Sequence, residues 1–237
     1  MPRPKAKSPP KAKRPKPLDA AAVGEVFARF RAALPEPKGE LHHVNAFTFL
    51  VAVVLSAQAT DKGVNKATLP LFARVNTPQA MLDLGEDRLR EAVRTIGLFR
   101  TKAKNVIALS ALLLTEYGGE VPESLEALER LPGVGRKTAN VVLNSIFGWP
   151  TIAVDTHLFR VANRLPLARG TTPLAVERGL VRVIPDDFKQ HAHHWLILHG
   201  RYVCKARRPL CNQCSIADLC RFPEKAVSTA ITPPQPP

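Results

Sequence analysis

A lysine beside a glycine turn is the first residue of this chain that could do covalent chemistry. It is Lys137, in the stretch LPGVGRKTAN of residues 131–140. Gly133 and Gly135 suit a tight turn, because glycine adopts backbone angles that other residues resist. Apolar residues recur at helical spacing after the turn, so it opens a helix whose free amides attract a phosphate. The dipole of that helix, and the partial burial that we expect, disfavour an ammonium ion at Lys137, and a neutral amine is a nucleophile that forms Schiff bases.

A carboxylate follows in the segment AVDTH, where Asp155 stands at the expected start of another helix. There it can cap the helix, stay ionised, and stabilise positive charge or assist a proton transfer. A phosphate-binding lysine and a merely capping aspartate are the alternative interpretations of this pair.

Four cysteines form the third candidate site, and all of them lie within residues 204–220. They are Cys204, Cys211, Cys214 and Cys220. In an intracellular protein, clustered thiols are more often metal ligands than disulfides. Structural zinc sites usually pair two short C-x-x-C units, and here only Cys211 and Cys214 form one. Four thiolates from one loop also suit an iron–sulfur cluster, so the spacing slightly favours iron–sulfur over zinc.

The elements that position these residues all have helical periodicity. Helices are predicted over residues 19–34, 46–57, 61–75, 86–95, 101–117, 124–131, 136–147, 155–165, 173–183 and 187–203. No convincing pair of strands is found. The segments 124–131 and 136–147 form a helical hairpin around the glycine turn. The fold class is therefore predicted to be all-α.

The charge of the chain favours a polyanionic partner. Its 34 basic and 20 acidic residues give a formal net charge of +14. Residues 1–17 hold seven cations and no acid, and we expect a disordered basic tail there, with a second disordered tail over 223–237. The longest apolar run, residues 47–57, is too short to span a bilayer, and no secretory signal is visible. An intracellular, nucleic-acid-binding protein is predicted.

Several long motifs together resemble the endonuclease III family of DNA base-excision glycosylases. These motifs are VLSAQATDKGVNKAT at 54–68, TIGLF at 95–99, the continuous segment 131–165, HHWLILHGRYVC at 193–204 and the cysteine spacing. The resemblance extends over roughly residues 19–222. Residues 39–47 and Arg100 match no firm pattern of the family.

The resemblance implies two helical domains that flank a DNA-binding cleft. Residues 39–148 would form a six-helix barrel with the helix-hairpin-helix, and 18–38 with 149–222 would form an iron–sulfur cluster domain. The four cysteines would hold a [4Fe-4S] cluster with a mainly structural or DNA-positioning role. The protein would be a cytoplasmic, nucleoid-associated monomer that binds double-stranded DNA containing a damaged base or an abasic site.

The implied activity is that of a bifunctional DNA glycosylase and abasic-site lyase for oxidised pyrimidines. Lys137 would attack C1′ of the sugar, Asp155 would assist, and β-elimination would cut the strand on the 3′ side. Gln58 would fill the gap left by the flipped nucleotide, and Leu98 would press on the opposite strand. The other expected DNA contacts are Gly133, Gly135, Arg136, Thr138, His157, Lys205 and Arg207.

A protein of another class explains many of the same features. A non-catalytic helix-hairpin-helix protein with a structural metal would account for the charge, the turn and the cysteines. It would not require Gln58, Lys137 and Asp155 together. Trapping with borohydride separates the two classes, because it captures only an enzyme that forms an imine.

Overall fold

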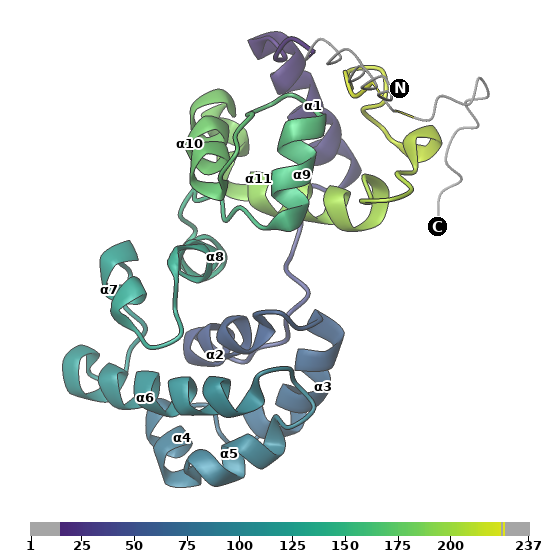
Figure 1. Ribbon diagram of the computed structural model, residues 1–237. Coiled ribbons are helices and arrows are strands. Elements are labelled where there is room, and N and C mark those ends of the chain that lie inside the picture. The colour runs from purple at the N-terminus through teal and green to yellow at the C-terminus, as the bar shows by residue number, and fades with distance from the viewer. Residues whose placement is uncertain (1–14, 224, 226–237) are drawn as a thin grey trace, which may run out of the picture.

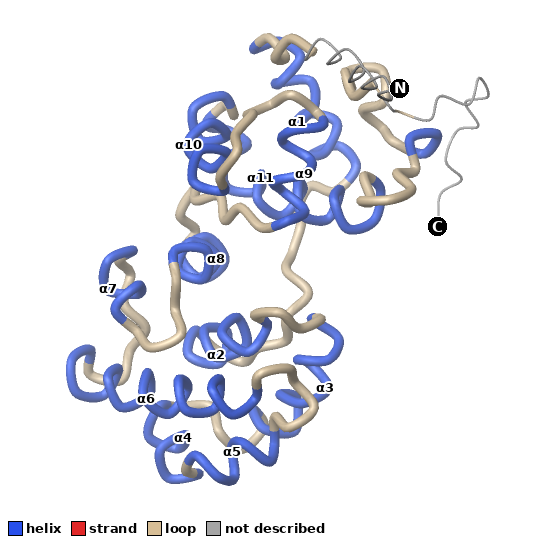
Figure 2. The backbone as a smooth tube through the Cα atoms, viewed as in Figure 1, coloured by secondary structure: helices blue, strands red, loops and turns tan. Residues whose placement is uncertain are grey.

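The computed structural model describes residues 15–223 and residue 225, and this part of the chain is helical without a strand (Figures 1 and 2). The all-α prediction is confirmed. Most of the two predicted tails, residues 1–14, 224 and 226–237, lies outside the described residues. The helices are α1 (Ala20–Ala33), α2 (Ala46–Ser56), α3 (Asp61–Phe72), α4 (Pro78–Leu84), α5 (Glu86–Ala92), α6 (Phe99–Tyr117), α7 (Leu125–Arg130), α8 (Arg136–Phe147), α9 (Thr156–Arg164), α10 (Pro173–Val183) and α11 (Asp186–Leu198), followed by the short η1 (His199–Val203) and η2 (Cys211–Gln213).

One helix was not predicted from the sequence. Helix α4 begins at Pro78, and the side chain of Thr77 caps it by accepting a hydrogen bond from the amide of Ala80 at 3.1 Å. Threonine before proline is a common start signal. The helix has only seven residues, too few for its apolar periodicity to stand out, although Met81 is fully buried.

The helices pack around two separate hydrophobic clusters. We call α2 to α8 the first lobe, because their buried side chains form one cluster between Phe47 and Leu143. The second lobe consists of α1, α9 to α11 and the cysteine segment, whose cluster joins Val23 near one end of the chain to Ile216 near the other. Helix α1 therefore packs on elements far along the sequence, as Figure 1 shows.

Helix α2 is the central element of the first lobe. Nine of its eleven residues, Phe47 to Leu55, are buried, so it is apolar on every side as its sequence predicts. It packs on α3, α6 and α8. Its C-terminal end leads directly into the segment that carries Gln58.

No helix among the described residues is long and apolar enough to cross a membrane.

Candidate functional site

The glycine turn forms the predicted helical hairpin. Helix α7 is capped by Ser124, and α8 starts directly after Gly135. Gly133 has a φ of +80°, and a Cβ atom built there would lie 2.9 Å from the side-chain nitrogen of Asn105 on α6. Gly135 has no atom near its Cβ position, and no side chain caps α8. The first amides of α8 therefore remain open to an anion from outside.

Lys137 is the second residue of α8, and its side chain is exposed. The partial burial that the sequence led us to expect is wrong, because nothing in the described structure covers the open end of the hairpin. The amine is accessible to a ligand that approaches α8. Its charge also reaches the buried ring of His193 on α11, where it helps to lower the histidine pKa.

Asp155 caps α9, as its position predicts. Its Oδ1 accepts hydrogen bonds from the amides of His157 and Leu158, both at 2.8 Å. Both bonds go to the same oxygen, so Oδ2 takes no part in the cap. The carboxylate is half-buried at the start of the helix.

His193 connects the segments that carry the two candidate catalytic residues. It is 3% exposed, and burial is the main cause that lowers its pKa to about 3. The backbone of Ala153, two residues before Asp155, acts to raise this pKa, whereas the charge of Lys137 acts to lower it. The structure therefore brings the start of α8 and the start of α9 to one buried histidine.

Gln58 and Leu98 lie at the tips of two adjacent loops. Among the described residues they are the two that are not glycine and yet have positive φ, at 56° and 59°. Both are exposed, and Leu98 keeps 59% of its surface accessible although it is apolar. The Cβ position of Gly97 lies 3.8 Å from the carbonyl oxygen of Gln58, so the loops touch. Strained backbone of this kind is typical of functional positions.

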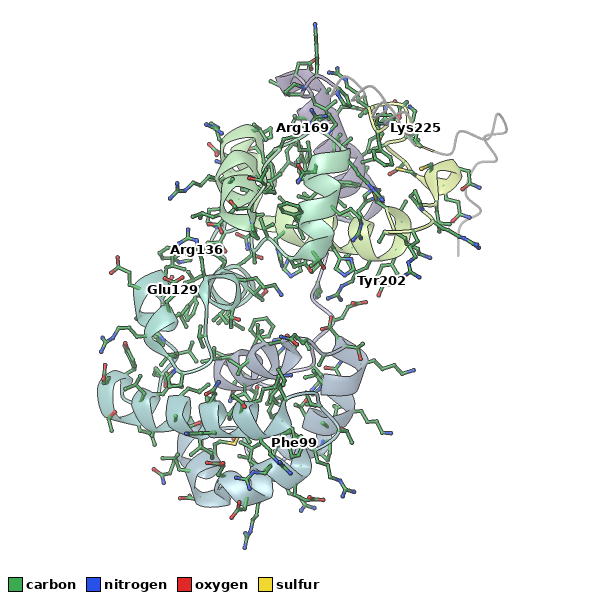
Figure 3. The ribbon with its side chains drawn as sticks, viewed as in Figure 1. Phe99, Glu129, Arg136, Arg169, Tyr202 and Lys225 are labelled. Carbon is green, nitrogen blue, oxygen red and sulfur yellow. The ribbon has the colours of Figure 1, made fainter. Side chains whose placement is uncertain are left out.

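The other predicted DNA contacts occupy different surroundings. Arg136 forms an ion pair at 2.7 Å with Glu177 of α10, which ties the hairpin to the second lobe; Figure 3 labels it beside Glu129. Thr138 is half-buried in the first turn of α8, whereas Lys205 and Arg207 are exposed in the cysteine segment. The Nδ1 atom of His157 lies 3.2 Å from a guanidinium nitrogen of Arg160.

A groove of about 910 Å³ lies between the two lobes beside these residues. From the first lobe it is lined by Thr60, Asp61 and Lys66, and from the second by His157 and Tyr202. Tyr202 points from the second lobe toward this gap (Figure 3).

An ion-pair cluster at this groove was not recognised in the sequence. Arg201 of η1 contacts both Glu40 and Asp61, and Tyr202 donates its hydroxyl to Glu40. These contacts join the second lobe to the start of α3 and to the segment before α2. These partners are far apart along the chain, so their spacing in the sequence could not predict the cluster. The sequence offered one indication, which is that Glu40 lies in a stretch that matches no firm pattern of the family.

The four predicted metal ligands are brought together in the second lobe. All four cysteines are free and line one cavity. Among the described residues, no three histidine, cysteine or acidic side chains converge closely enough for a single metal ion. Four thiols around a common cavity are a ligand set that a metal centre could use.

The surroundings of the cysteines also suit bound thiolates. Burial raises the pKa of Cys214 to about 11 and also raises that of Cys220. A coordinated metal supplies the positive charge that such thiolates need. Donors are close by, because Arg164 lies 3.7 Å from the sulfur of Cys204 and the Nε2 of His199 lies 3.9 Å from that of Cys214.

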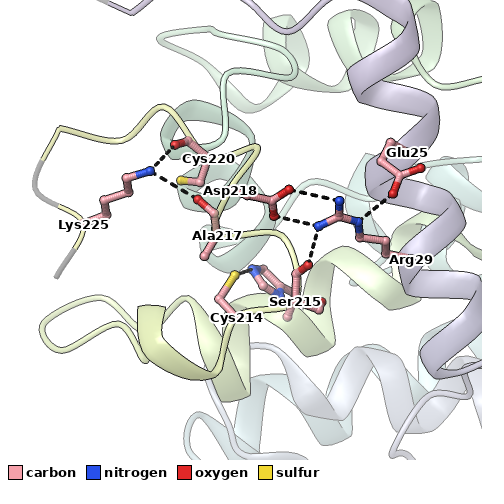
Figure 4. Close-up of polar contacts among 9 residues, drawn as sticks. Glu25, Arg29, Cys214, Ser215, Ala217, Asp218, Cys220 and Lys225 are labelled. Atoms are coloured by element: carbon pink, nitrogen blue, oxygen red, sulfur yellow. Dashed lines mark hydrogen bonds and ion pairs between the residues drawn. The ribbon is translucent and has the colours of Figure 1, made fainter. Parts of the chain in front are cut away.

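Helix α1 anchors the cysteine segment. The Arg29 guanidinium binds both oxygens of Asp218, at 2.6 and 3.0 Å, and the carbonyl of Ser215 at 2.9 Å (Figure 4). The ammonium of Lys225 donates to the carbonyls of Ala217 and Cys220. These contacts hold the loop between Cys214 and Cys220 against the lobe.

Comparison with known proteins identifies the family. Residues 51–186 match the model of the HhH-GPD superfamily base excision DNA repair proteins, and residues 204–220 match the iron-sulfur binding domain of endonuclease III. Endonuclease III of Treponema pallidum is 60% identical over 86% of this chain and 96% of its own, and that of Escherichia coli K12 is 55% identical over 85% and 95%. The chain belongs to the endonuclease III family.

Solved structures agree with this family membership. A trapped covalent intermediate of an endonuclease III with DNA matches with a TM-score of 0.81 and 44% identity, over 86% of this chain and 97% of that chain. A non-covalent endonuclease III–DNA complex matches equally well, with a TM-score of 0.81. A thermostable thymine-DNA glycosylase, at 22% identity and a TM-score of 0.74, shares the fold. The second match of the family, at 204–220, covers all four cysteines and identifies the cofactor of this endonuclease III chain as a [4Fe-4S] cluster.

Proposed function

We propose that this chain is a bifunctional DNA glycosylase and abasic-site lyase of base excision repair, with Lys137 as its nucleophile. The observation that carries this proposal is an exposed lysine in the first turn of a helix that no side chain caps, together with the capping carboxylate Asp155 at the start of the next helix. Membership of the endonuclease III family and the likeness to a trapped covalent endonuclease III–DNA intermediate support it. Oxidised pyrimidines are the proposed substrate bases.

The first chemical step is a substitution at the sugar. The amine of Lys137, once it has lost its proton, attacks C1′, and the bond from C1′ to the damaged base breaks, so that the base leaves with the bonding electron pair. Positive charge develops on the sugar during this step. The ionised Asp155 stabilises that charge, and its Oδ2 is the oxygen left free by the cap.

The second step cuts the strand. The attacking nitrogen gives up a proton, and the bond from C1′ to O4′ then breaks as O4′ takes up a proton. The product is a protonated imine (iminium) with Lys137, which acidifies the proton at C2′. Loss of that proton expels the phosphate on the 3′ side by β-elimination. Water then hydrolyses the imine and releases Lys137.

The remaining predicted residues bind and shape the DNA. Gly133, Gly135 and the first amides of α8 would bind a backbone phosphate without reading sequence. Gln58 would occupy the gap of the flipped nucleotide while Leu98 presses on the opposite strand. Arg136, Thr138, His157, Lys205 and Arg207 remain proposed contacts, and Arg136 would have to share its guanidinium with Glu177.

The two hydrophobic clusters support the proposed division into domains. Residues 39–148 would form the barrel domain, and 18–38 with 149–222 the cluster domain. When bound, the [4Fe-4S] cluster supplies a rigid structural centre rather than a reacting group. Cys204, Cys211, Cys214 and Cys220 hold it and thereby position the basic loop of Lys205 and Arg207.

The proposed partner is double-stranded DNA with a damaged base or abasic site. We propose a monomer that acts in the cytoplasm at the nucleoid. The net charge of +14 favours such a polyanion.

The test uses purified protein and a panel of duplexes, each with one defined lesion: thymine glycol, 5-hydroxycytosine or dihydrouracil. We expect base release and 3′ cleavage at several of them, and a covalent product with borohydride. Binding to all duplexes without release, cleavage or trapping would contradict the proposal and favour a non-catalytic DNA-binding protein.

A further inference from the structure

Lys102 is a buried lysine that the proposed chemistry does not use. Only 5% of its surface is exposed, although it lies in the first turn of α6. Burial lowers the pKa of its amine, and it forms no ion pair among the described residues. Burial of an amine is costly unless the group makes a specific contact.

That contact is the last turn of α2. The Nζ atom of Lys102 donates a hydrogen bond of 2.9 Å to the carbonyl oxygen of Leu55. In a continuing helix this carbonyl would accept from the amide of Ala59, but that amide donates to Ser56 instead. Lys102 therefore satisfies a carbonyl at the helix end, where the dipole also favours a cation.

Lys102 also forms a hydrogen bond to the loop that carries Leu98. The backbone amide of Lys102 donates to the carbonyl of Leu98 at 3.1 Å and closes the first turn of α6. Three residues beyond Leu55 in the chain is Gln58. One lysine therefore connects the end of α2, which leads to Gln58, with the start of α6, which begins after Leu98.

The loops that carry Gln58 and Leu98 both need a contact that holds their backbone in place. Gln58 and Leu98 have left-handed backbone angles, which persist only where the surroundings hold them. Their side chains are exposed. The Lys102 bond joins the two segments, and close to it the Cβ position of Gly97 lies 3.8 Å from the carbonyl oxygen of Gln58.

We propose that Lys102 is a positioning residue that holds Gln58 and Leu98 at the separation needed to enter a duplex together. The inference rests on the proposed function, because it assigns those two side chains to the DNA. It predicts that Lys102 acts only where two strands must be separated. A single-stranded abasic site needs no such separation.

The experiment compares Lys102→Met with Lys104→Met. Methionine keeps much of the length of lysine but cannot donate, and Lys104 is an exposed lysine of the same helix whose loss controls for charge. Two oligonucleotides are used: a duplex with one dihydrouracil, and a single strand with a preformed abasic site. Single-turnover rates are measured on both, and thermal unfolding checks that each variant is folded.

Lys102→Met should slow release from the duplex by about tenfold or more while cleavage of the single strand stays within about twofold of the parent. Lys104→Met should show no such difference between the substrates. In a Gln58→Ala, Leu98→Ala background, Lys102→Met should add less than about a further twofold, because residues that act through one another are not additive. Should Lys102→Met fail to fold, Lys102→Gln replaces it; its amide can still donate but ends one bond short of the lysine nitrogen, so the difference between the substrates should be smaller but in the same direction.

An equal loss on both substrates, full additivity in the triple variant, or no loss at all would overturn the role of Lys102. Wild-type protein that cleaves neither substrate would instead contradict the proposed function. The two failures are thus distinguishable.

Discussion

Asp155 combines two tasks that one substitution separates. Asparagine caps helices as well as aspartate does, so Asp155→Asn should preserve the bonds to His157 and Leu158. The substitution removes the negative charge that, in our proposal, stabilises the positive charge developing on the sugar. We expect base release to slow by roughly a hundredfold in single-turnover assays, with DNA affinity retained.

Thermal unfolding of Asp155→Asn provides the control for the cap. An unchanged midpoint together with the slow reaction assigns the effect to charge. Activity within about twofold of wild type, a barrier change below roughly 0.5 kcal/mol, would mean that the aspartate is only a cap.

His193 predicts how stability depends on pH. Its folded pKa is near 3, mainly because of burial and also because of His194, Lys137 and Arg201 nearby, whereas an unfolded histidine titrates near 6.5. Between these values the unfolded chain binds a proton that the folded chain does not. The stability contributed by neutral His193 is therefore complete above about pH 6.5 and is lost as the pH falls.

His193→Asn removes this titration. The loss of unfolding free energy from pH 7.5 to pH 5.5, measured by urea denaturation, should be smaller in the variant by about 1 kcal/mol. His194, whose pKa is also lowered by burial, stays in both proteins, so some pH dependence should remain. Identical pH profiles would show that His193 does not titrate in this way.

At the scale of the element, the two glycines of the hairpin should differ. Gly133→Ala must adopt a positive φ and place its Cβ 2.9 Å from Asn105, so we expect a loss of stability of about 1–2 kcal/mol or more. Gly135→Ala has a φ of −102° and open space at Cβ, so its stability should change by less than about 0.5 kcal/mol.

In DNA affinity, Gly135→Ala should be the affected variant, although its stability is unchanged. The Cβ of Gly135→Ala would stand where we propose that a phosphate approaches, so binding should weaken although the fold is intact. Titration with an undamaged duplex measures this. Unchanged affinity in Gly135→Ala would remove the phosphate from this end of α8.

The sequence predicted those features that are encoded within a short segment of the chain. The hairpin, the cap at Asp155 and the cysteine set were predicted, because turn residues and ligand spacing lie within short segments. Lys102 was missed, although it shares a helical stripe with Val106, Leu109 and Leu113, which are buried. The carbonyl that makes its burial tolerable belongs to another helix, and no local pattern reports such a partner.

For the whole molecule, periodicity could identify the buried face of each helix but not its partner. Phe27 of α1 packs on Phe188 and Trp195 of α11, with ring centres 5.9 and 6.3 Å away. Nothing in residues 19–34 indicates that these partners lie so far along the chain. The assignment of α1 to the cluster domain came from the family resemblance, and the hydrophobic cluster of the second lobe supports it.

The basic segment 1–17 leads to a prediction about DNA affinity. It holds seven cations and no acid, and residues 1–14 lie outside the described part. Each neutralised phosphate contributes about 0.9 to the dependence of log affinity on log salt. If the segment engages two to four phosphates, its deletion should reduce that slope by roughly 2–4. Affinity for damaged and undamaged duplexes should fall together, while single-turnover cleavage by bound enzyme stays the same.

Truncated and full-length proteins with identical salt slopes would leave the segment without a role in DNA binding. A slope change with only the damaged duplex would point to contacts near the lesion rather than to general phosphate binding.

The central claim is that the amine of Lys137 forms a covalent bond with the sugar. The most direct measurement is borohydride trapping on a lesion-containing duplex by wild-type protein and by Lys137→Gln, which keeps a polar side chain of similar reach but no amine. We predict a cross-linked band for wild type and none for the variant, with strand cleavage abolished and DNA binding retained. Undiminished trapping in Lys137→Gln would contradict the account, because another amine would then be the nucleophile.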